Sequence, residues 1–504
     1  AEHASRDGKA VLKSTSQMAT DRALIKSAIK LVETQEMAPE RAIWEAATSF
    51  ADQMAALGGY MAERVTDIHD VRARIVAELT GQQAPGIPVS DEPFILAAID
   101  LAPADTATLD PEKVIALITS DGGPQAHTAI LARGLGLPAI VAAKGVTEIA
   151  DGTIVYVDSN EGIVDTEPTD ADREAAIKYA NRKPVADFDG QGVLADGTRV
   201  PLYANVGDGK SAEKAASLKA EGVGLLRTEF GFLGHDAEPS IETQAKTYKS
   251  VFDAFPGKHI VVRTLDAGAD KPLPFLNVNP EENPALGVRG FRTDWTVPGV
   301  LTRQLEAIKA ASENSDADIW VMAPMISTTS EARNFANMLK EIGLPVHGVM
   351  VETPAAVMNA EAILGEVDFV SIGTNDLTQY TMAADRLRGD LAHLNNPWQP
   401  AVLKMIKMTV EGAQRASVTA GKKKYVSVCG EAAADPALAV VLIGLGVDTL
   451  SMNAGAIPAV AAVLKSVTKE KAQQIAAIAL QQISSAEAKE SARKALPILD
   501  ELGL

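Results

Sequence analysis

The strongest constraint on the fold is a series of eight apolar runs that alternate with helical patterns from Val200 onward. In chain order the runs are PLYANV, GVGLLR, HIVVRT, DIWVMAP, VHGVMVE, VDFVSIG, YVSVCG and VDTLSMN. Strands that alternate with helices favour parallel pairing, and eight such units in roughly 300 residues are typical of a (β/α)8 barrel. We therefore predict a TIM barrel over residues 191–504.

Three shorter regions precede the barrel. Residues 1–82 carry apolar side chains at helical spacing, Ile25 and Ile29 among them, which predicts a small helical bundle. Residues 83–168 contain short apolar runs separated by turns and predict a compact α/β domain. The charged, helix-prone residues 169–190 are interpreted as a helical linker. The expected fold class is a multidomain α/β protein.

The charge of the chain restricts its partners. The sequence has 66 acidic and 47 basic residues, which gives a net charge of -19. Such a negative field repels nucleic acid and anionic membranes, so we expect neither as a partner, whereas a basic protein would be attracted. An anionic substrate would need a local cluster of arginines that acts against the overall charge.

Cysteine content and apolar stretches indicate the compartment. Cys429 is the only cysteine, so no internal disulfide can form and the reducing cytoplasm is expected. The longest apolar stretch, Ala437 to Val447, is shorter than the roughly 20 residues that span a bilayer, and we interpret it as a buried helix without membrane insertion. The first residues, AEHASRDGKA, contain neither a signal-peptide core nor an initiator methionine, so we expect the true start of the protein to be missing.

Two carboxylates follow neighbouring predicted strands. Glu352 ends the fifth run and Asp376 follows the sixth. The carboxyl ends of barrel strands meet at the face that holds TIM-barrel active sites, so we expect these acids to lie close together. Like charges repel unless a cation lies between them, and Mg²⁺ accepts one or two carboxylates together with water and substrate oxygens. We predict magnesium ligands, and the alternative is a pair of surface or helix-capping acids.

Four arginines could converge on the same face: Arg227, Arg263, Arg289 and Arg386. Planar guanidinium groups match the oxygens of phosphate and carboxylate, so this pattern indicates an acidic substrate that carries both groups. The alternative for each arginine taken singly is a structural ion pair, such as Arg227 with Glu229.

Two further residues have the chemistry of catalytic groups. His127 follows a Gly-Gly-Pro turn in GGPQAHTAILARGLGLPAIV and opens an apolar-faced helix, whose N-terminus would favour a phosphate on the imidazole. Neutral imidazole is also a competent nucleophile at phosphorus. Cys429 ends the seventh run, where a thiol could donate a proton to substrate. The alternatives are a helix-start histidine without a role and an inert, small apolar cysteine.

Several motifs resemble those of one family. In wording and order, GVGLLRTEF, VVRTLDAGADK, EENPALGVRGFR, GVMVETPAA, SIGTNDLTQYTMAADR and VSVCGEAAAD are similar to the phosphoenolpyruvate-binding barrel of Enzyme I of the bacterial sugar phosphotransferase system. GGPQAHTAILAR resembles the phosphohistidine motif of that family. The resemblance covers nearly the whole chain. It implies phosphoryl transfer from phosphoenolpyruvate to a histidine and on to the carrier protein HPr, with release of pyruvate, as the first step of sugar uptake.

The resemblance also implies roles for individual residues. His127 matches the phosphorylated nucleophile, acting through Nε2, and Cys429 matches the proton donor to the departing enolate. Glu352 and Asp376 match the ligands of Mg²⁺. The residues that match contacts to phosphoenolpyruvate are Arg227, Arg263, Arg289, Asn375, Asp376 and Arg386.

Partners and alternatives follow from the same resemblance. It makes the helical bundle the docking site for HPr and implies a homodimer formed through the barrel domain. It also implies that the helical region is N-terminally incomplete, because the opening strand and the first long helix of the family are missing from this sequence. Pyruvate phosphate dikinase and phosphoenolpyruvate synthase share the histidine and barrel modules but add an ATP-binding domain, which nothing in this sequence matches. A dikinase-like relative without that domain, and a regulatory relative that binds phosphoenolpyruvate or HPr without turnover, are the alternatives. Pro124, Gln125 and Ala126 replace the usual Arg-Thr-Ser, so we expect the contacts to the phosphohistidine to differ.

Overall fold

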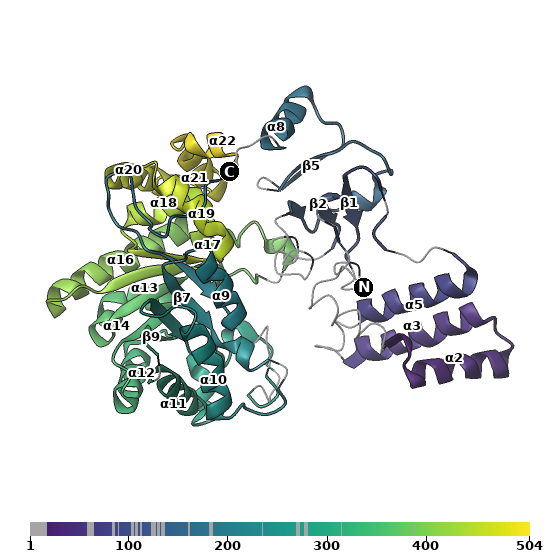
Figure 1. Cartoon of the computed structure of the whole chain (residues 1–504), viewed down its shortest axis with the longest axis horizontal. Helices are drawn as coiled ribbons and strands as arrows, with labels where there is room; N and C mark the ends of the chain where they lie inside the picture. Colours follow the sequence, from purple (N-terminus) through teal and green to yellow (C-terminus); the bar gives the residue numbers. More distant parts are fainter. Residues whose placement is uncertain are drawn as a thin grey trace. The chain divides into compact units, whose positions relative to one another are not determined.

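The computed structural model divides the chain into two units, residues 1–177 with 387–389 and residues 178–386 with 390–504 (Figure 1). Each unit has apolar cores of its own, and the finer domain boundaries given above stay predictions. Within the described residues every helix is too short or too polar to cross a lipid bilayer. The residues that the structure describes are 18–57, 65–82, 86–88, 90–101, 105, 109–110, 113–121, 128, 132, 137–159, 162–180, 185–233, 235–268, 273–276, 281–313, 315–386 and 388–504.

The first unit begins with the predicted helical bundle. Its helices, which lie side by side in Figure 1, are α2 (Arg22–Gln35), α3 (Pro39–Leu57) and α5 (Val65–Thr80). The helical period is confirmed, but Ile25 and Ile29 do not form the buried face, since they are 40% and 50% exposed. Leu24 and Ala28 are buried instead, because they pack against the alanines that α3 contributes to the bundle core.

A small α/β domain follows, with three parallel strands in the order β1-β2-β3 and an antiparallel hairpin of β4 and β5. The elements are β1 (Phe94–Ala98), β2 (Val114–Thr119), β3 (Ala139–Ile140), η1 (Val146–Glu148), β4 (Tyr156–Asp158), β5 (Ile163–Asp165) and α8 (Asp170–Ala180). His127 and the three residues before it lie outside the described residues. The next residue, Thr128, is buried and donates a hydrogen bond from its hydroxyl to Asp100 Oδ1 at 2.8 Å.

The second unit contains a closed barrel of eight parallel strands, in which β13 pairs with β6 and every other strand pairs with its neighbours in sequence. The strands are β6 (Leu202–Val206), β7 (Gly222–Arg227), β8 (His259–Arg263), β9 (Asp318–Ala323), β10 (His347–Val351), β11 (Phe369–Gly373), β12 (Tyr425–Cys429) and β13 (Thr449–Met452). Each strand falls within one of the eight predicted runs, so the TIM barrel is confirmed.

Helices surround the barrel strands (Figure 1). They are α9 (Gly209–Ser217), α10 (Ile241–Phe252), α11 (Val300–Ser312), α12 (Thr329–Ile342), α13 (Pro354–Met358), α14 (Ala360–Glu366), α15 (Thr374–Met382), α16 (Pro400–Ala420), α17 (Glu431–Ala434), α18 (Pro436–Leu445), α19 (Ile457–Leu464), α20 (Lys469–Leu480), α21 (Ser485–Lys494) and α22 (Ile498–Leu502). Short 3₁₀ segments are η2 (Thr228–Gly231), η3 (Pro284–Leu286), η4 (Gly290–Trp295), η5 (Gly389–Leu391) and η6 (Ala454–Ala456).

The sequence forms these elements through apolar strands and capped helices. β10 and β11 are buried at every position, because helices cover the outside of a barrel and side chains fill its interior. α12 begins at a capping box of Thr328 and Glu331 and ends at Gly343, which has a φ of 84°. The apolar cluster enclosed by the strands consists of Leu225, Val261, Met322, Met350, Phe369 and Cys429. The barrel therefore has a packed interior, and its site lies at the strand ends.

Candidate active site

The ends of β7 and β8 bring two arginines and two acids together. Arg227 lies opposite Arg263 in the register of the two strands. Arg263 Nη2 donates to Glu229 Oε1 at 2.6 Å, and Arg263 Nη1 lies 3.1 Å from Asp266 Oδ2. Burial alone would lower the pKa of Arg263, but Glu229 and Asp266 outweigh burial and raise it. The guanidinium therefore stays charged although it is only 7% exposed.

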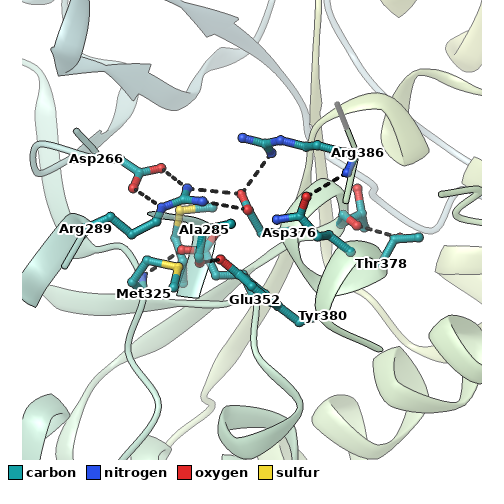
Figure 2. Close-up of polar contacts among 12 residues, drawn as sticks. Asp266, Ala285, Arg289, Met325, Glu352, Asp376, Thr378, Tyr380 and Arg386 are labelled. Carbon is teal, nitrogen blue, oxygen red and sulfur yellow. Dashed lines mark hydrogen bonds and ion pairs between the residues drawn. The ribbon is translucent and has the colours of Figure 1, made fainter. Parts of the chain in front are cut away.

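Arg289, from the long connection between β8 and α11, bridges two buried carboxylates (Figure 2). Its Nε and Nη2 donate to Asp266 Oδ1 and Oδ2 at 3.3 and 3.0 Å, and its Nη1 donates to Asp376 Oδ1 at 2.9 Å. The close approach depends on Gly268, because a Cβ at that position would lie 2.4 Å from Arg289 Cβ. The motif VVRTLDAGADK therefore supplies both an acid and the space for its partner.

Asp376 has a second arginine partner. It lies in the first turn of α15, directly after β11, and its Oδ2 accepts from Arg386 Nη1 at 3.2 Å (Figure 2). The backbone N–H of Arg386 donates to Gln379 Oε1 at 2.9 Å, which ties the backbone at Arg386 to α15. The Arg386 side chain is 20% exposed, so it borders the solvent side of the charged cluster.

Glu352 directly follows β10, and its hydrogen-bond partner has an unusual backbone conformation. Its Oε1 accepts from the backbone N–H of Met325 at 2.7 Å (Figure 2), and Met325 has a φ of 60°, which is uncommon for a residue with a side chain. Its Oε2 is buried and has no hydrogen-bond partner among the described residues. Burial and the carboxylates of Asp376 and Asp266 raise the pKa of Glu352 to about 8. Full ionisation at neutral pH therefore requires additional positive charge beside this carboxylate.

The surroundings of Glu352 Oε2 fit a divalent cation. The charge of Asp376 acts on Glu352, and the two residues follow neighbouring strands. Gly373 leaves space beside the oxygen, since a Cβ there would lie 2.7 Å from Glu352 Oε2. In the described part of the chain no group of three or more His, Cys, Asp or Glu side chains is arranged to hold a metal. Two carboxylates suit Mg²⁺, because Mg²⁺ takes its remaining ligands from water and substrate.

Arg227 and Asn375 have side-chain donors that no other side chain accepts from in the described part of the chain. Among the described residues Arg227 has no hydrogen-bond or ion-pair partner, since Glu229 pairs with Arg263 instead. Burial and the charge of Arg263 lower the pKa of Arg227. Asn375 precedes Asp376 and lies beside the end of β12, since a Cβ at Gly430 would be 3.4 Å from Asn375 Oδ1. Both side chains are therefore available to an anion at the strand ends.

Cys429 ends β12 with its thiol in the enclosed apolar cluster. The residue is 2% exposed, and its Sγ lies 3.7 Å from the carbonyl oxygen of Ile372. Burial raises the pKa of the thiol, and Glu352 raises it further, while Arg263 and Arg227 act in the opposite direction. The thiol therefore keeps its proton at neutral pH, as a proton donor must.

The structure joins four of the nine predicted site residues through Asp266. Arg263 contacts Asp266, which contacts Arg289, which contacts Asp376, which contacts Arg386, so one ion-pair network crosses the strand ends. Of the other predicted residues, Arg227 ends β7 beside Arg263 on β8. Glu352, Asn375 and Cys429 lie at the ends of the neighbouring strands β10, β11 and β12. His127 lies outside the described residues, and the roles of all these residues stay predictions.

Sequence reasoning assigns no role to Asp266, Met325 and Tyr380, and it names Glu229 only as an alternative partner of Arg227. Glu229 and Asp266 could have been found from the predicted arginines, because buried arginines require carboxylate partners. No comparable feature of the sequence points to Met325 or Tyr380. The hydroxyl of Tyr380 donates to the carbonyl of Ala285 and so ties the long connection to α15 (Figure 2).

A barrel that gathers arginines and carboxylates at its strand ends has the site of an enzyme that binds a small, multiply charged oxyanion. Residues 185–469 match the family model of the PEP-binding domain of PEP-utilising enzymes, where PEP is phosphoenolpyruvate. Residues 90–162 match the mobile domain of these enzymes, and residues 1–64 match their N-terminal domain. The chain belongs to the phosphoenolpyruvate-protein phosphotransferase family, which confirms the resemblance.

Three relatives support this assignment over most of the chain. The phosphoenolpyruvate-protein phosphotransferase of Streptomyces coelicolor is 46% identical over 97% of this chain and 88% of its own length. That of Haloferax volcanii is 39% identical over 90% of this chain and 81% of its own length. That of Staphylococcus carnosus is 37% identical over 85% of this chain and 77% of its own length.

Proposed function

We propose that this chain moves the phosphoryl group of phosphoenolpyruvate to His127 and then to HPr, releasing pyruvate, as the first step of sugar uptake. The observation that carries the proposal is the buried network of Arg263, Arg289, Asp376 and Arg386 at the strand ends of a PEP-binding barrel. Phosphoenolpyruvate carries a phosphate and a carboxylate, and guanidinium groups bind both.

The arginines have separate roles in this proposal. Arg227 and Arg263 bind the phosphoryl oxygens, while Asn375 and Arg386 bind the remaining oxygens of the substrate and Arg289 lines the same site. Negative charge spreads over the phosphoryl group during transfer, and guanidinium groups that are already held in place neutralise it without reorganisation. Burial strengthens this effect, because electrostatic interactions weaken less in a low-dielectric site than in water.

Glu352 and Asp376 would hold Mg²⁺. Bound there, the cation supplies Lewis-acid neutralisation of substrate oxygens. The charges of Arg227, Arg263, Arg289 and Arg386 cancel those of Glu229, Asp266, Glu352 and Asp376 when all are ionised. A divalent cation therefore gives the site a net positive charge, which attracts an anionic substrate to a chain whose overall charge is -19.

His127 acts from outside the barrel. Its Nε2 attacks the phosphorus in line with the bond that breaks, and the enolate leaves. The histidine belongs to the unit of residues 1–177, whereas the charged cluster belongs to the other unit. Phosphoryl transfer therefore requires a hinge motion that brings the two units together for loading and apart for delivery to HPr.

Replacing Cys429 with alanine is expected to slow pyruvate formation while sparing part of the phosphoryl transfer. The buried thiol is protonated, and we propose that it donates its proton to the enolate carbon; loss of a general acid typically costs about 10²- to 10⁴-fold in rate. The measurements are pyruvate release, coupled to lactate dehydrogenase, and protein-bound phosphate. Cys429→Ser, which keeps a proton donor, is the matched control. Unchanged pyruvate release in Cys429→Ala would remove the acid role.

We also propose the assembly and location of the enzyme. HPr docks on the helical bundle, and two copies pair through their barrel domains as a homodimer. The cytoplasm suits the single cysteine, which has no partner for a disulfide within the chain.

A coupled pyruvate assay with Mg²⁺ and added HPr tests the function. We expect pyruvate to accumulate beyond one equivalent of enzyme only when HPr is present, because HPr empties the phosphorylated histidine. Without HPr, release is expected to stop near one equivalent. Absence of pyruvate under both conditions would favour a binding relative without turnover.

A further inference from the structure

A buried amide from α11 joins the ends of β7 and β8. The register of the two strands ends at the pair Arg227 and Arg263. One residue further, Thr228 Oγ1 donates to the carbonyl oxygen of Arg263 at 2.9 Å. Gln304 Nε2 donates to Thr228 Oγ1 at 3.0 Å, and Gln304 Oε1 accepts from the backbone N–H of Leu265 at 2.8 Å. The Gln304 side chain therefore extends the connection between the strands past the end of their pairing.

The surroundings of Gln304 hold its amide in one orientation. Its Nε2 also donates to the hydroxyl of Tyr248 at 3.0 Å, and that hydroxyl donates to Gln244 Oε1 at 3.1 Å. Gln304 and Tyr248 are each 1% exposed, and Thr228 is 2% exposed. A buried polar network whose members are all paired is rigid, because any rotation leaves a donor or acceptor without a partner.

The segments held by Gln304 are those that carry the charged groups. Thr228 lies between Arg227 and Glu229, and Leu265 lies between Arg263 and Asp266. A movement of either segment changes the distance between the two arginines that face the phosphoryl group. Misplacement of a binding group by about 1 Å can cost up to roughly 10²-fold in rate.

We infer that Gln304 is a positioning residue that sets the spacing of Arg227 and Arg263 for the phosphoryl group of phosphoenolpyruvate. It acts through Thr228 and the backbone of Leu265. The inference rests on the proposed function, since it assumes that these arginines bind phosphoenolpyruvate.

The test measures binding of phosphoenolpyruvate with Mg²⁺ to the full chain by titration calorimetry. The background is His127→Ala, which binds the substrate without accepting its phosphate. Gln304→Met keeps the length of the side chain but removes all three hydrogen bonds, and we expect it to raise the Kd roughly 10- to 100-fold. In the chain with His127 intact, KM for phosphoenolpyruvate is expected to rise in parallel.

Tyr248→Phe is the matched control. It removes one bond of Gln304 on the side away from the strands and leaves the bonds to Thr228 and Leu265 in place. We expect it to lower the unfolding temperature, as Gln304→Met does, but to leave the Kd unchanged. The control therefore separates loss of stability from loss of positioning.

A Gln304→Met protein that binds phosphoenolpyruvate as tightly as its parent would overturn the inference. If that variant does not fold, Thr228→Val replaces it, because valine removes only the hydroxyl that links Gln304 to Arg263. Weaker binding by Thr228→Val supports the inference, and unchanged binding overturns it. A His127→Ala parent that binds no phosphoenolpyruvate would instead contradict the proposed function, and the inference with it.

Discussion

Replacing His127 with alanine is expected to abolish stable uptake of phosphate from labelled phosphoenolpyruvate. The imidazole is the only group that we propose to form a bond to phosphorus, so its removal leaves a barrel that binds substrate without an acceptor for the phosphoryl group. The measurement is protein-bound label after incubation with Mg²⁺ and quenching in alkali, in which phosphohistidine survives.

His69→Ala is the control for this experiment. His69 is an exposed histidine on α5 and takes no part in the proposed loading of the enzyme. It should leave the label at the level of the unmodified chain. An undiminished stable label in His127→Ala would refute the assignment of the nucleophile.

Replacing Arg289 with methionine is expected to destabilise the barrel by about 3 to 5 kcal/mol, because it breaks two buried ion pairs and removes the charge that Asp266 and Asp376 share. Each carboxylate then keeps one arginine, Arg263 for Asp266 and Arg386 for Asp376. The Arg289 side chain is only 4% exposed, so solvent cannot take over its role. The measurement is urea unfolding followed by tryptophan fluorescence. Three of the four tryptophans, Trp295, Trp320 and Trp398, belong to the barrel unit.

Arg415→Met is the matched control for the loss of an arginine. Arg415 Nε lies 2.6 Å from Glu361 Oε2, but its side chain is 59% exposed, so water can solvate both charges when the pair is removed. We expect little change in its unfolding. An Arg289→Met barrel as stable as the control would show that Asp266 and Asp376 do not depend on the arginine.

The barrel could be predicted from the sequence because its strands are buried on both faces. The run VDFVSIG is mostly apolar, and every residue of the strand that it forms, FVSIG, is buried. The helices between runs fix the parallel order of the strands. In the helical bundle, the sequence pattern does not decide which apolar residues are buried. Ile25 and Leu24 are both apolar and adjacent, and only packing against α3 decides that Leu24 is buried.

The charged part of the site could be predicted because polar residues at the carboxyl ends of barrel strands share one face. Glu352 and Asp376 follow neighbouring strands, as the order of the runs requires. The partners of each charge could not be predicted in the same way. Arg227 is closest in sequence to Glu229, yet Arg263 takes that acid, since side-chain direction at the strand ends decides the pairing.

The supporting residues are harder to find in the sequence. Met325 contributes only its backbone N–H, which any residue carries. The hydroxyl of Tyr380 binds a backbone carbonyl, so no partner side chain in the sequence points to this contact. The sequence gives a weak signal for Gln304. It lies three residues after Leu301 and four before Ile308, a helical spacing that places it on the buried face of α11. A buried amide requires partners, but only the fold identifies Thr228 and Leu265 as those partners.

Mass spectrometry of the unmodified chain after incubation with phosphoenolpyruvate and Mg²⁺ tests the central claim most directly. The account predicts one phosphate on the imidazole of His127, formed together with one equivalent of pyruvate and removed when HPr is added. Phosphate on any other residue, or pyruvate without a phosphorylated protein, would contradict it.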